Sequence, residues 1–138
     1  MNIEEIADTL PNGFHDALVR GISLDYERRE VVFALDVWVG DLDSDDPAAR
    51  EEYRCGVLKL SGLLYFVVEP PDVPAEQLRL GEEGSLWLTA DSSDFGELKS
   101  YPKLPEPLPG GGFRHWFFVS DLNCFMYIAA TAASFVWE

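Results

Sequence analysis

Residues 11–39, PNGFHDALVRGISLDYERREVVFALDVWV, predict an opening β-hairpin around which the rest of the chain is organised. The Asn12-Gly13 pair is a strong turn signal immediately before the first periodic residues. Over residues 14–26 the apolar side chains fall mainly on even positions, an alternation typical of a half-buried strand. After the charged turn at 27–29, every odd position of residues 31–39 is apolar. This second run is the clearest strand in the chain.

The remaining patterns predict more strands and little helix. Residues 2–9 suit about two turns of helix, and residues 53–69 suit one bent strand or two. Residues 129–133 are ambiguous between helix and strand, and we assign them to strand because aromatic and β-branched residues precede them. Further strands are expected at 85–90, 113–119 and 123–136, and the prolines and glycines of 101–112 predict a loop. The prediction is a mostly β fold (a β-rich α+β fold) of six or seven largely antiparallel strands, in a sandwich or open barrel with a short N-terminal helix.

The composition is that of one folded domain. The 138 residues are 47% hydrophobic and 13% aromatic, and domains cluster near ~100–150 residues. We therefore expect a single domain over residues 1–138. Cys55 and Cys124 lie far apart in apolar runs, which favours two buried free thiols and gives no support to a zinc site. No cofactor is expected.

Acidic residues dominate the charge of the chain. Ten Lys and Arg stand against 25 Asp and Glu, for a formal net charge of -15. Phosphate backbones and anionic bilayers would be repelled, so neither nucleic acid nor a membrane is an expected partner. The charge favours solubility and a salt-sensitive encounter with a basic protein. The first residues lack the basic and apolar regions of a secretory signal, which predicts a cytoplasmic protein.

His15, Asp16 and His115 are the candidates for acid–base chemistry. Successive residues of a strand point to opposite faces, so His15 and Asp16 are not expected to form a dyad on one surface. A His and an Asp beside a turn more often bond the local backbone, and this structural role is favoured. A small enzyme that uses His15 and His115 stays open as an alternative.

Residues 41–52 carry the densest run of carboxylates. Asp41, Asp43, Asp45 and Glu52 have the spacing of ligands 1, 3, 5 and 12 in an EF-hand calcium loop, but Asp46 stands where the sharp turn needs Gly. A solvated loop is favoured over a calcium site, and no metal is predicted. The loop is instead the expected contact with a basic partner. Its contact residues are predicted to be Asp41, Asp43, Asp45, Asp46, Glu51 and Glu52.

Aromatic residues are abundant, with four Trp, nine Phe and five Tyr. Filling the core is their favoured role. A small apolar-ligand binding β-barrel is a second alternative, because aromatic side chains also line such cavities. An exposed edge strand would allow two copies to pair as a homodimer.

Short motifs in the first half of the chain carry a resemblance. They are Asn12-Gly13-Phe14-His15-Asp16-Ala17, Ile22-Ser23-Leu24-Asp25-Tyr26, and Ser61-Gly62-Leu63 leading to Glu69-Pro70-Pro71-Asp72. These motifs resemble small uncharacterised bacterial proteins, some of them immunity-like, of the polymorphic-toxin immunity type. The resemblance implies a cytoplasmic binding protein that neutralises a toxin, and it supplies no catalytic residues. The leading hypothesis is therefore a non-enzymatic acidic interaction domain that binds a basic partner.

Overall fold

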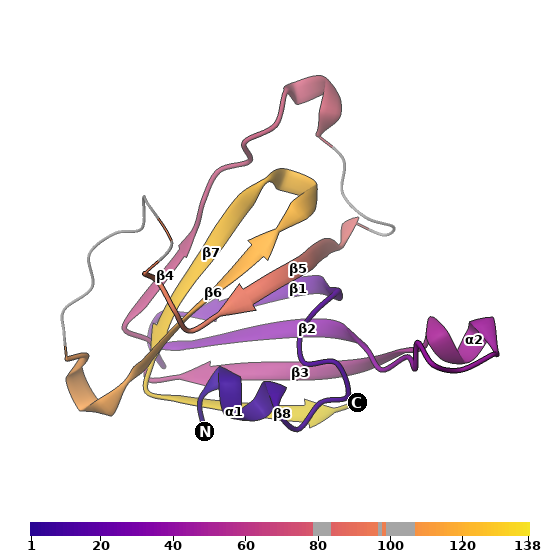
Figure 1. The fold of residues 1–138 in the computed structure, drawn as a ribbon. Helices are drawn as coiled ribbons and strands as arrows, with labels where there is room; N and C mark the ends of the chain where they lie inside the picture. The colour runs from indigo at the N-terminus through magenta and orange to yellow at the C-terminus, as the bar shows by residue number, and fades with distance from the viewer. Residues whose placement is uncertain (79–83, 97, 99–106) are drawn as a thin grey trace.

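The computed structural model describes residues 1–78, 84–96, 98 and 107–138. Within these ranges one sheet has eight strands in the order β4-β7-β6-β5-β1-β2-β3-β8, with every neighbouring pair antiparallel (Figure 1). The mostly β prediction and the short N-terminal helix are confirmed, with eight strands in place of six or seven. No helix in the described ranges has the length and apolar character needed to span a membrane. The elements are α1 (Ile3–Ala7), β1 (Ala17–Asp25), β2 (Glu30–Trp38), α2 (Pro47–Arg50), β3 (Tyr53–Ser61), β4 (Tyr65–Val68), η1 (Ala75–Gln77), β5 (Leu86–Ser92), η3 (Pro109–Gly111), β6 (Phe113–Val119), η4 (Ser120–Leu122), β7 (Cys124–Ala130) and β8 (Ala132–Trp137).

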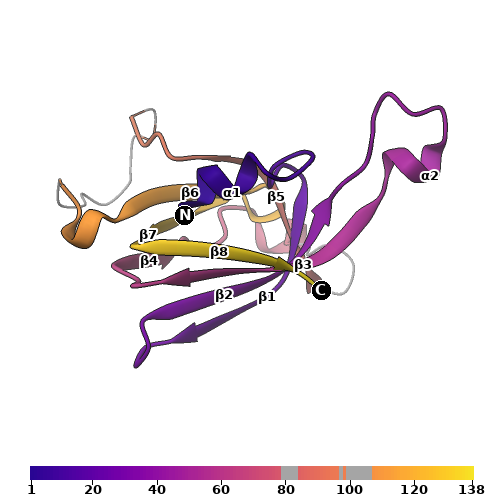
Figure 2. The same cartoon turned by 90° about the horizontal axis from the view of Figure 1, so that it is seen from below.

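The sheet curls so that its inner face packs against itself. One half consists of β1, β2, β3 and β8, and the other of β5, β6, β7 and β4 (Figures 1 and 2). Phe33 of β2 contacts Phe117 of β6 and Phe66 of β4, with ring centroids 6.3 and 6.0 Å apart. Phe14, which precedes β1, adds an edge-to-face contact with Phe117 at 6.0 Å. The core therefore lies between the two halves of one open, curled sheet. Of the predicted loop at 101–112, residues 101–106 lie outside the described ranges.

The opening hairpin forms as predicted, but the inward face changes within β1. Ala17 and Val19 are buried, whereas beyond Arg20 it is Ile22 that packs against the core. The pairing of β1 with β2 skips Arg20, which is a β-bulge, and one extra residue moves all later side chains to the opposite face. The prediction of an even-numbered apolar face is therefore wrong for Leu18, which lies on the outer face.

The chain passes between the two halves at two adjacent points. β3 leads into β4 through residues 62–64, and β7 leads into β8 through Thr131. The N–H of Thr131 donates to the carbonyl oxygens of Ser61 and Gly62 at 3.1 and 3.2 Å. Gly62 has a φ of 61°, and a Cβ at this position would overlap Thr131 Oγ1. Backbone conformation and close approach both require glycine here.

Helix α1 packs on β8 and covers one end of the core. Its N-terminus is a capping box, in which Asn2 Oδ1 accepts from the N–H of Glu5 at 2.8 Å and the Glu5 carboxylate accepts from the N–H of Asn2 at 2.7 Å. Both isoleucines of the helix are buried. The carbonyl oxygen of Met1 accepts from the N–H of Ala133 at 2.7 Å, which ties the N-terminus to β8.

A polar cluster joins the strands of the β1, β2, β3 and β8 half on the outer face. Arg20 lies 2.9 Å from Asp36 and 3.1 Å from Glu138. The thiol of Cys55 donates to Asp36 Oδ1 at 3.1 Å. Cys55 is exposed and Cys124 is buried, so the prediction of two buried thiols holds only for Cys124.

Replacing Gly62 by Ala should destabilise the protein by about 1–3 kcal/mol, because the substitution combines a strained φ with an overlap against Thr131. Urea unfolding should show a lower midpoint with an unchanged m value. Gly111→Ala is the matched control, since Gly111 also has a positive φ but nothing within 4 Å of its Cβ. Equal losses in the two variants would contradict the role given to Thr131.

Candidate functional site

The β2–β3 hairpin continues beyond the sheet as an arm that carries α2 (Figures 1 and 2). We call residues 39–52 the acidic arm. The N–H of Asp41 donates to the carbonyl oxygen of Ala49 at 2.9 Å, so the two sides of the arm are bonded to each other. Gly40 lies at its base, where a Cβ would overlap the carbonyl oxygen of Arg50. The arm is thus a continuation of the β2–β3 hairpin, and the close approach of Gly40 to Arg50 fixes the direction in which the arm leaves the sheet.

All six carboxylates predicted to bind a partner lie on the acidic arm. Two of them also shape it, because Asp46 Oδ1 accepts from the N–H of Ala48 at 3.1 Å as the N-cap of α2, and Asp41 Oδ1 accepts from the N–H of Asp43 at 2.9 Å. No group of three or more His, Cys, Asp or Glu side chains in the described ranges is placed to hold a metal ion, those with the EF-hand spacing included. The six are Asp41, Asp43, Asp45, Asp46, Glu51 and Glu52.

A groove of about 520 Å³ lies where the acidic arm meets the outer face of the sheet. Large apolar side chains line it while remaining open to solvent, with relative exposures of 69% for Leu42, 42% for Tyr53 and 41% for Trp87. Exposed apolar surface that gathers in one place is typical of an interaction site. We call it the aromatic groove, and its lining consists of His15, Asp16, Trp38, Leu42, Arg50, Glu51, Tyr53 and Trp87.

Strand alternation explains why the aromatic side chains of this groove point outward. Val37 is buried on the inner face, so the next residue, Trp38, lies on the outer face, directly opposite Tyr53 of β3. Trp87 of β5 is paired with Leu18 of β1, and both lie on the outer face. Core filling is the role predicted for the aromatic residues, but the apolar run on the odd positions of 31–39 already indicates the opposite, outer face for Trp38.

The chain before β1 brings His15 and Asp16 to the same groove. His15 Nδ1 lies 2.9 Å from Asp16 Oδ2, so the prediction that these two side chains would not meet is wrong. The alternation rule fails because both residues precede the strand, and Asp16 has a φ of 62°. The hydroxyl of Tyr53 donates to the carbonyl oxygen of Asp16 at 3.1 Å, which ties this turn to β3. The His15 ring is 60% exposed.

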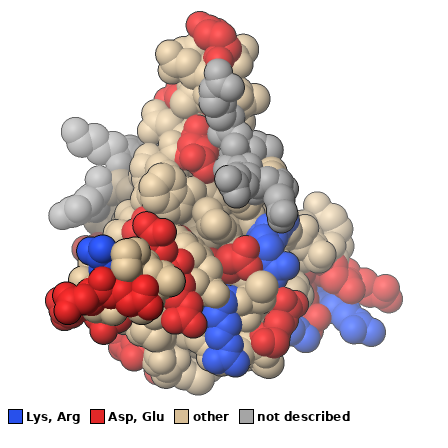
Figure 3. Space-filling view, turned by 90° about the vertical axis from the view of Figure 1, so that its right-hand side faces the viewer, with Lys and Arg blue, Asp and Glu red and all other residues tan. Residues whose placement is uncertain are grey.

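Two carboxylates of the aromatic groove, those of Asp16 and Glu51, act on the hydroxyl of Tyr53. Burial raises the pKa of Tyr53 above its ordinary value of 10.0, and the carboxylates of Asp16 and Glu51 raise it further by disfavouring a phenolate beside them. Figure 3 views the molecule from the side that carries the arm, where acidic side chains form several groups and basic side chains lie beside some of them. Arg50 and His15 are the basic residues of the lining.

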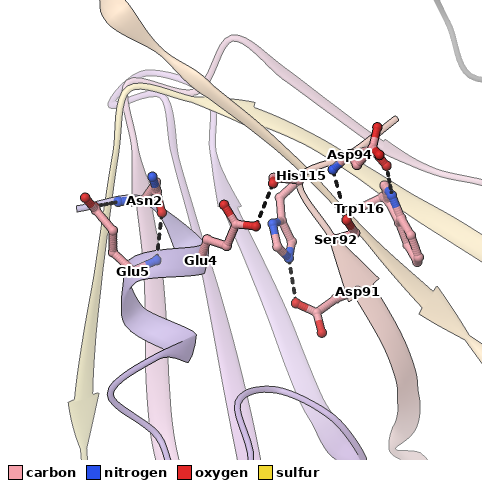
Figure 4. A network of polar contacts seen from close by, with 9 residues as sticks. Asn2, Glu4, Glu5, Asp91, Ser92, Asp94, His115 and Trp116 are labelled. Carbon is pink, nitrogen blue, oxygen red and sulfur yellow. Dashed lines mark hydrogen bonds and ion pairs between the residues drawn. The ribbon is translucent and has the colours of Figure 1, made fainter. Parts of the chain in front are cut away.

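His115 lies in a different environment from His15. It is 2% exposed, and its Nε2 lies 2.7 Å from Asp91 Oδ2, an interaction between β6 and β5 (Figure 4). Its ring packs on Phe117 at 5.1 Å between centroids. The hydroxyl of Ser93 donates to Glu4 Oε1 at 2.8 Å, which links α1 to the same region.

The cavity that His115 lines is small. The adjoining cavity has a volume of about 30 Å³, room for roughly one water molecule. His15 lines the aromatic groove and His115 lines this cavity, so the two histidines belong to separate sites. The His115–Asp91 contact joins β6 to β5, and the separate hydrogen bond from Ser93 to Glu4 ties α1 to the same region.

A second apolar opening lies between the tip of the β1–β2 hairpin and the start of β4. It has a volume of about 200 Å³, with Leu24, Tyr26, Arg29, Tyr65 and Phe66 among its lining residues. Small-molecule sites occupy roughly 300–1,000 Å³ and enclose most of the ligand. This opening is therefore smaller than the cavity that a ligand-binding barrel requires.

The chain was compared with protein-family models, with curated proteins and with solved structures. No protein-family model matches the chain, and no curated protein matches it. Among solved structures, the chain is similar to an uncharacterised protein from Neisseria gonorrhoeae, with 15% sequence identity, a TM-score of 0.42, and coverage of 88% of this chain and 91% of that one.

The double variant Asp16→Asn, Glu51→Gln should lower the pKa of Tyr53 toward 10, because the two carboxylates that disfavour its phenolate are neutralised. Asparagine tolerates the positive φ of residue 16. NMR titration of ring-labelled tyrosine, with Tyr53→Phe for assignment, measures the change. Tyr127, whose pKa is raised to about 12 mainly by burial and by Glu69, is the internal reference and should not move. An unchanged Tyr53 pKa would contradict the effect assigned to the carboxylates of Asp16 and Glu51.

Proposed function

We propose that the protein is a non-enzymatic interaction domain that binds a basic protein through the acidic arm and the aromatic groove, as an immunity-like protein binds a toxin. The observation that carries the proposal is the juxtaposition of Leu42, Tyr53 and Trp87, all exposed, with the carboxylates of the arm. Protein interfaces combine aromatic anchors with a charged surround in this way. The resemblance of the first half of the chain to immunity-like proteins points in the same direction.

The two parts of the surface would contribute differently to binding. Aromatic side chains that lose contact with water supply affinity. The arm carries six carboxylates and one basic residue, Arg50, in residues 39–52, and such a field mainly accelerates association with an oppositely charged partner. Binding is therefore expected to weaken with added salt while keeping a salt-resistant component.

We further propose a cytoplasmic location. Cys55 and Cys124 are both free thiols, which suits a reducing compartment. A homodimer formed by edge pairing stays a separate prediction, since β4 and β8 are the two edges of the sheet.

Replacing Asp41, Asp43, Asp45 and Asp46 together by Asn should weaken binding of the basic partner about tenfold or more at low salt and leave folding intact. Asparagine is also a good N-cap, so α2 should persist when Asp46 is changed. The partner is captured from lysate at low salt, purified, and its affinity for each variant is measured by calorimetry. The products of neighbouring genes are tested in the same way.

The matched control removes the same charge elsewhere, with Asp8→Asn, Glu27→Gln, Asp72→Asn and Glu76→Gln, all of them exposed and outside the arm. The control should lose much less affinity than the arm variant. Equal affinity of the arm variant and the control for the purified partner would remove the arm from the interface. Far-ultraviolet circular dichroism and thermal unfolding verify that both variants are folded.

A further inference from the structure

We infer that the aromatic groove binds the guanidinium group of an arginine side chain presented by the basic partner, an inference that rests on the proposed function. The groove combines three aromatic side chains with two carboxylates at one end of the sheet. The combination of flat π faces and negative charge is the chemistry that recognises a planar cation.

The aromatic side chains provide the stacking surface. Trp38, Tyr53 and Trp87 come from three different strands and line one groove of about 520 Å³. Trp offers the best face for a cation, and arginine is preferred over lysine because its planar, weakly hydrated guanidinium stacks on rings. The chain makes the same contact within itself, since Arg54 lies 4.6 Å from the Trp137 ring centroid and Arg114 lies 5.4 Å from that of Phe95.

The carboxylates provide the charge. Asp16 and Glu51 both line the groove, and their field reaches Tyr53, whose pKa they raise. A guanidinium can donate two parallel hydrogen bonds to a carboxylate while its plane stacks on a ring. Two basic residues oppose it: His15, whose Nδ1 already lies 2.9 Å from Asp16, and Arg50, which is exposed on the arm. Removing the Arg50 charge should therefore strengthen binding.

Charge also decides which class of molecule is expected to occupy the groove. A second copy of this chain would bring another net charge of -15 to the same surface, and a nucleic acid would bring phosphates of the same sign. A basic protein brings the opposite sign. Among its side chains arginine fits both the rings and the carboxylates.

The test uses a seven-residue Gly/Ser peptide with one central arginine, together with the same peptide carrying citrulline, which has the same shape without the charge. Binding is followed through the indole N–H NMR signals of Trp38 and Trp87, assigned with single Trp→Phe variants. The arginine peptide should shift both signals with a Kd on the order of 1 mM, as expected for one cation–aromatic contact assisted by carboxylates. The citrulline peptide should bind at least about threefold more weakly.

Three variants of lining residues test the inference: two should weaken binding of the arginine peptide, and one should strengthen it. Trp87→Ala and Glu51→Gln should each weaken the arginine peptide about three- to tenfold. Arg50→Gln should strengthen it about twofold or more, because a like charge is removed. Trp87 is on the outer face and 41% exposed, so its truncation leaves the core intact. Tyr26→Ala, which removes an aromatic residue that is 85% exposed at the other opening, is the control and should change nothing.

The outcomes separate this inference from the proposed function. Equal binding of the citrulline peptide, or unmoved Trp38 and Trp87 signals, would overturn the assignment of a guanidinium to the groove. If binding of the purified partner depends on the four arm aspartates but not on Trp87, the assignment of a guanidinium to the groove is overturned while the proposed function is supported. A purified partner insensitive to both the arm and the Trp87 variants would overturn both.

Discussion

The packing of the inner face of the sheet against itself, centred on Phe33, is the constraint on which the rest of the structure depends. The Phe33 ring meets Phe66 and Phe117 from the opposite half, and this contact requires the sheet to curl. Because strand residues alternate, filling the inner face with apolar side chains commits every second residue to the outer face. The space left beside His115 is about 30 Å³. In the proposed function, recognition of another molecule therefore uses the outer face and the ends of the strands.

The acidic arm and the aromatic groove form one surface because Trp38, the last residue of β2, lines the groove and is hydrogen-bonded to the arm. Its ring lines the groove, while its Nε1–H donates to the carbonyl oxygen of Arg50 at 2.8 Å and so fixes the return side of the arm. Gly40 allows this close approach, since a Cβ there would overlap both Trp38 Nε1 and the Arg50 carbonyl. The carboxylates of the arm are thus held at a fixed place relative to the exposed rings. A surface with its charges and rings already placed loses less conformational entropy when it binds.

Alternation and turn signals predict most of the fold but only part of the site. The run at 31–39 predicts β2 because its alternation has no interruption. The β-bulge at Arg20 is marked only by a charged residue on the predicted apolar face, which does not show that the later residues change faces, and an apolar Leu18 is compatible with either face. The contact of His15 with Asp16 escapes the alternation rule because a turn, not a strand, positions both residues. The carboxylates of the arm are visible as a charge run, whereas Trp87 joins the groove only through pairing with a strand distant in sequence.

In the proposed function, net charge would give the exposed aromatic side chains their selectivity. Rings such as those of Tyr53 and Trp87 would by themselves favour contact with any apolar surface, including a second copy of the chain. A net charge of -15, with six carboxylates on the arm beside them, makes that contact unfavourable between like molecules and favourable with a cationic one. In the proposed function, the apolar part of the surface would supply affinity and the charged part would exclude wrong partners. Dimerisation would then have to use the sheet edges β4 or β8 and not the groove, which leaves the groove free for a basic protein.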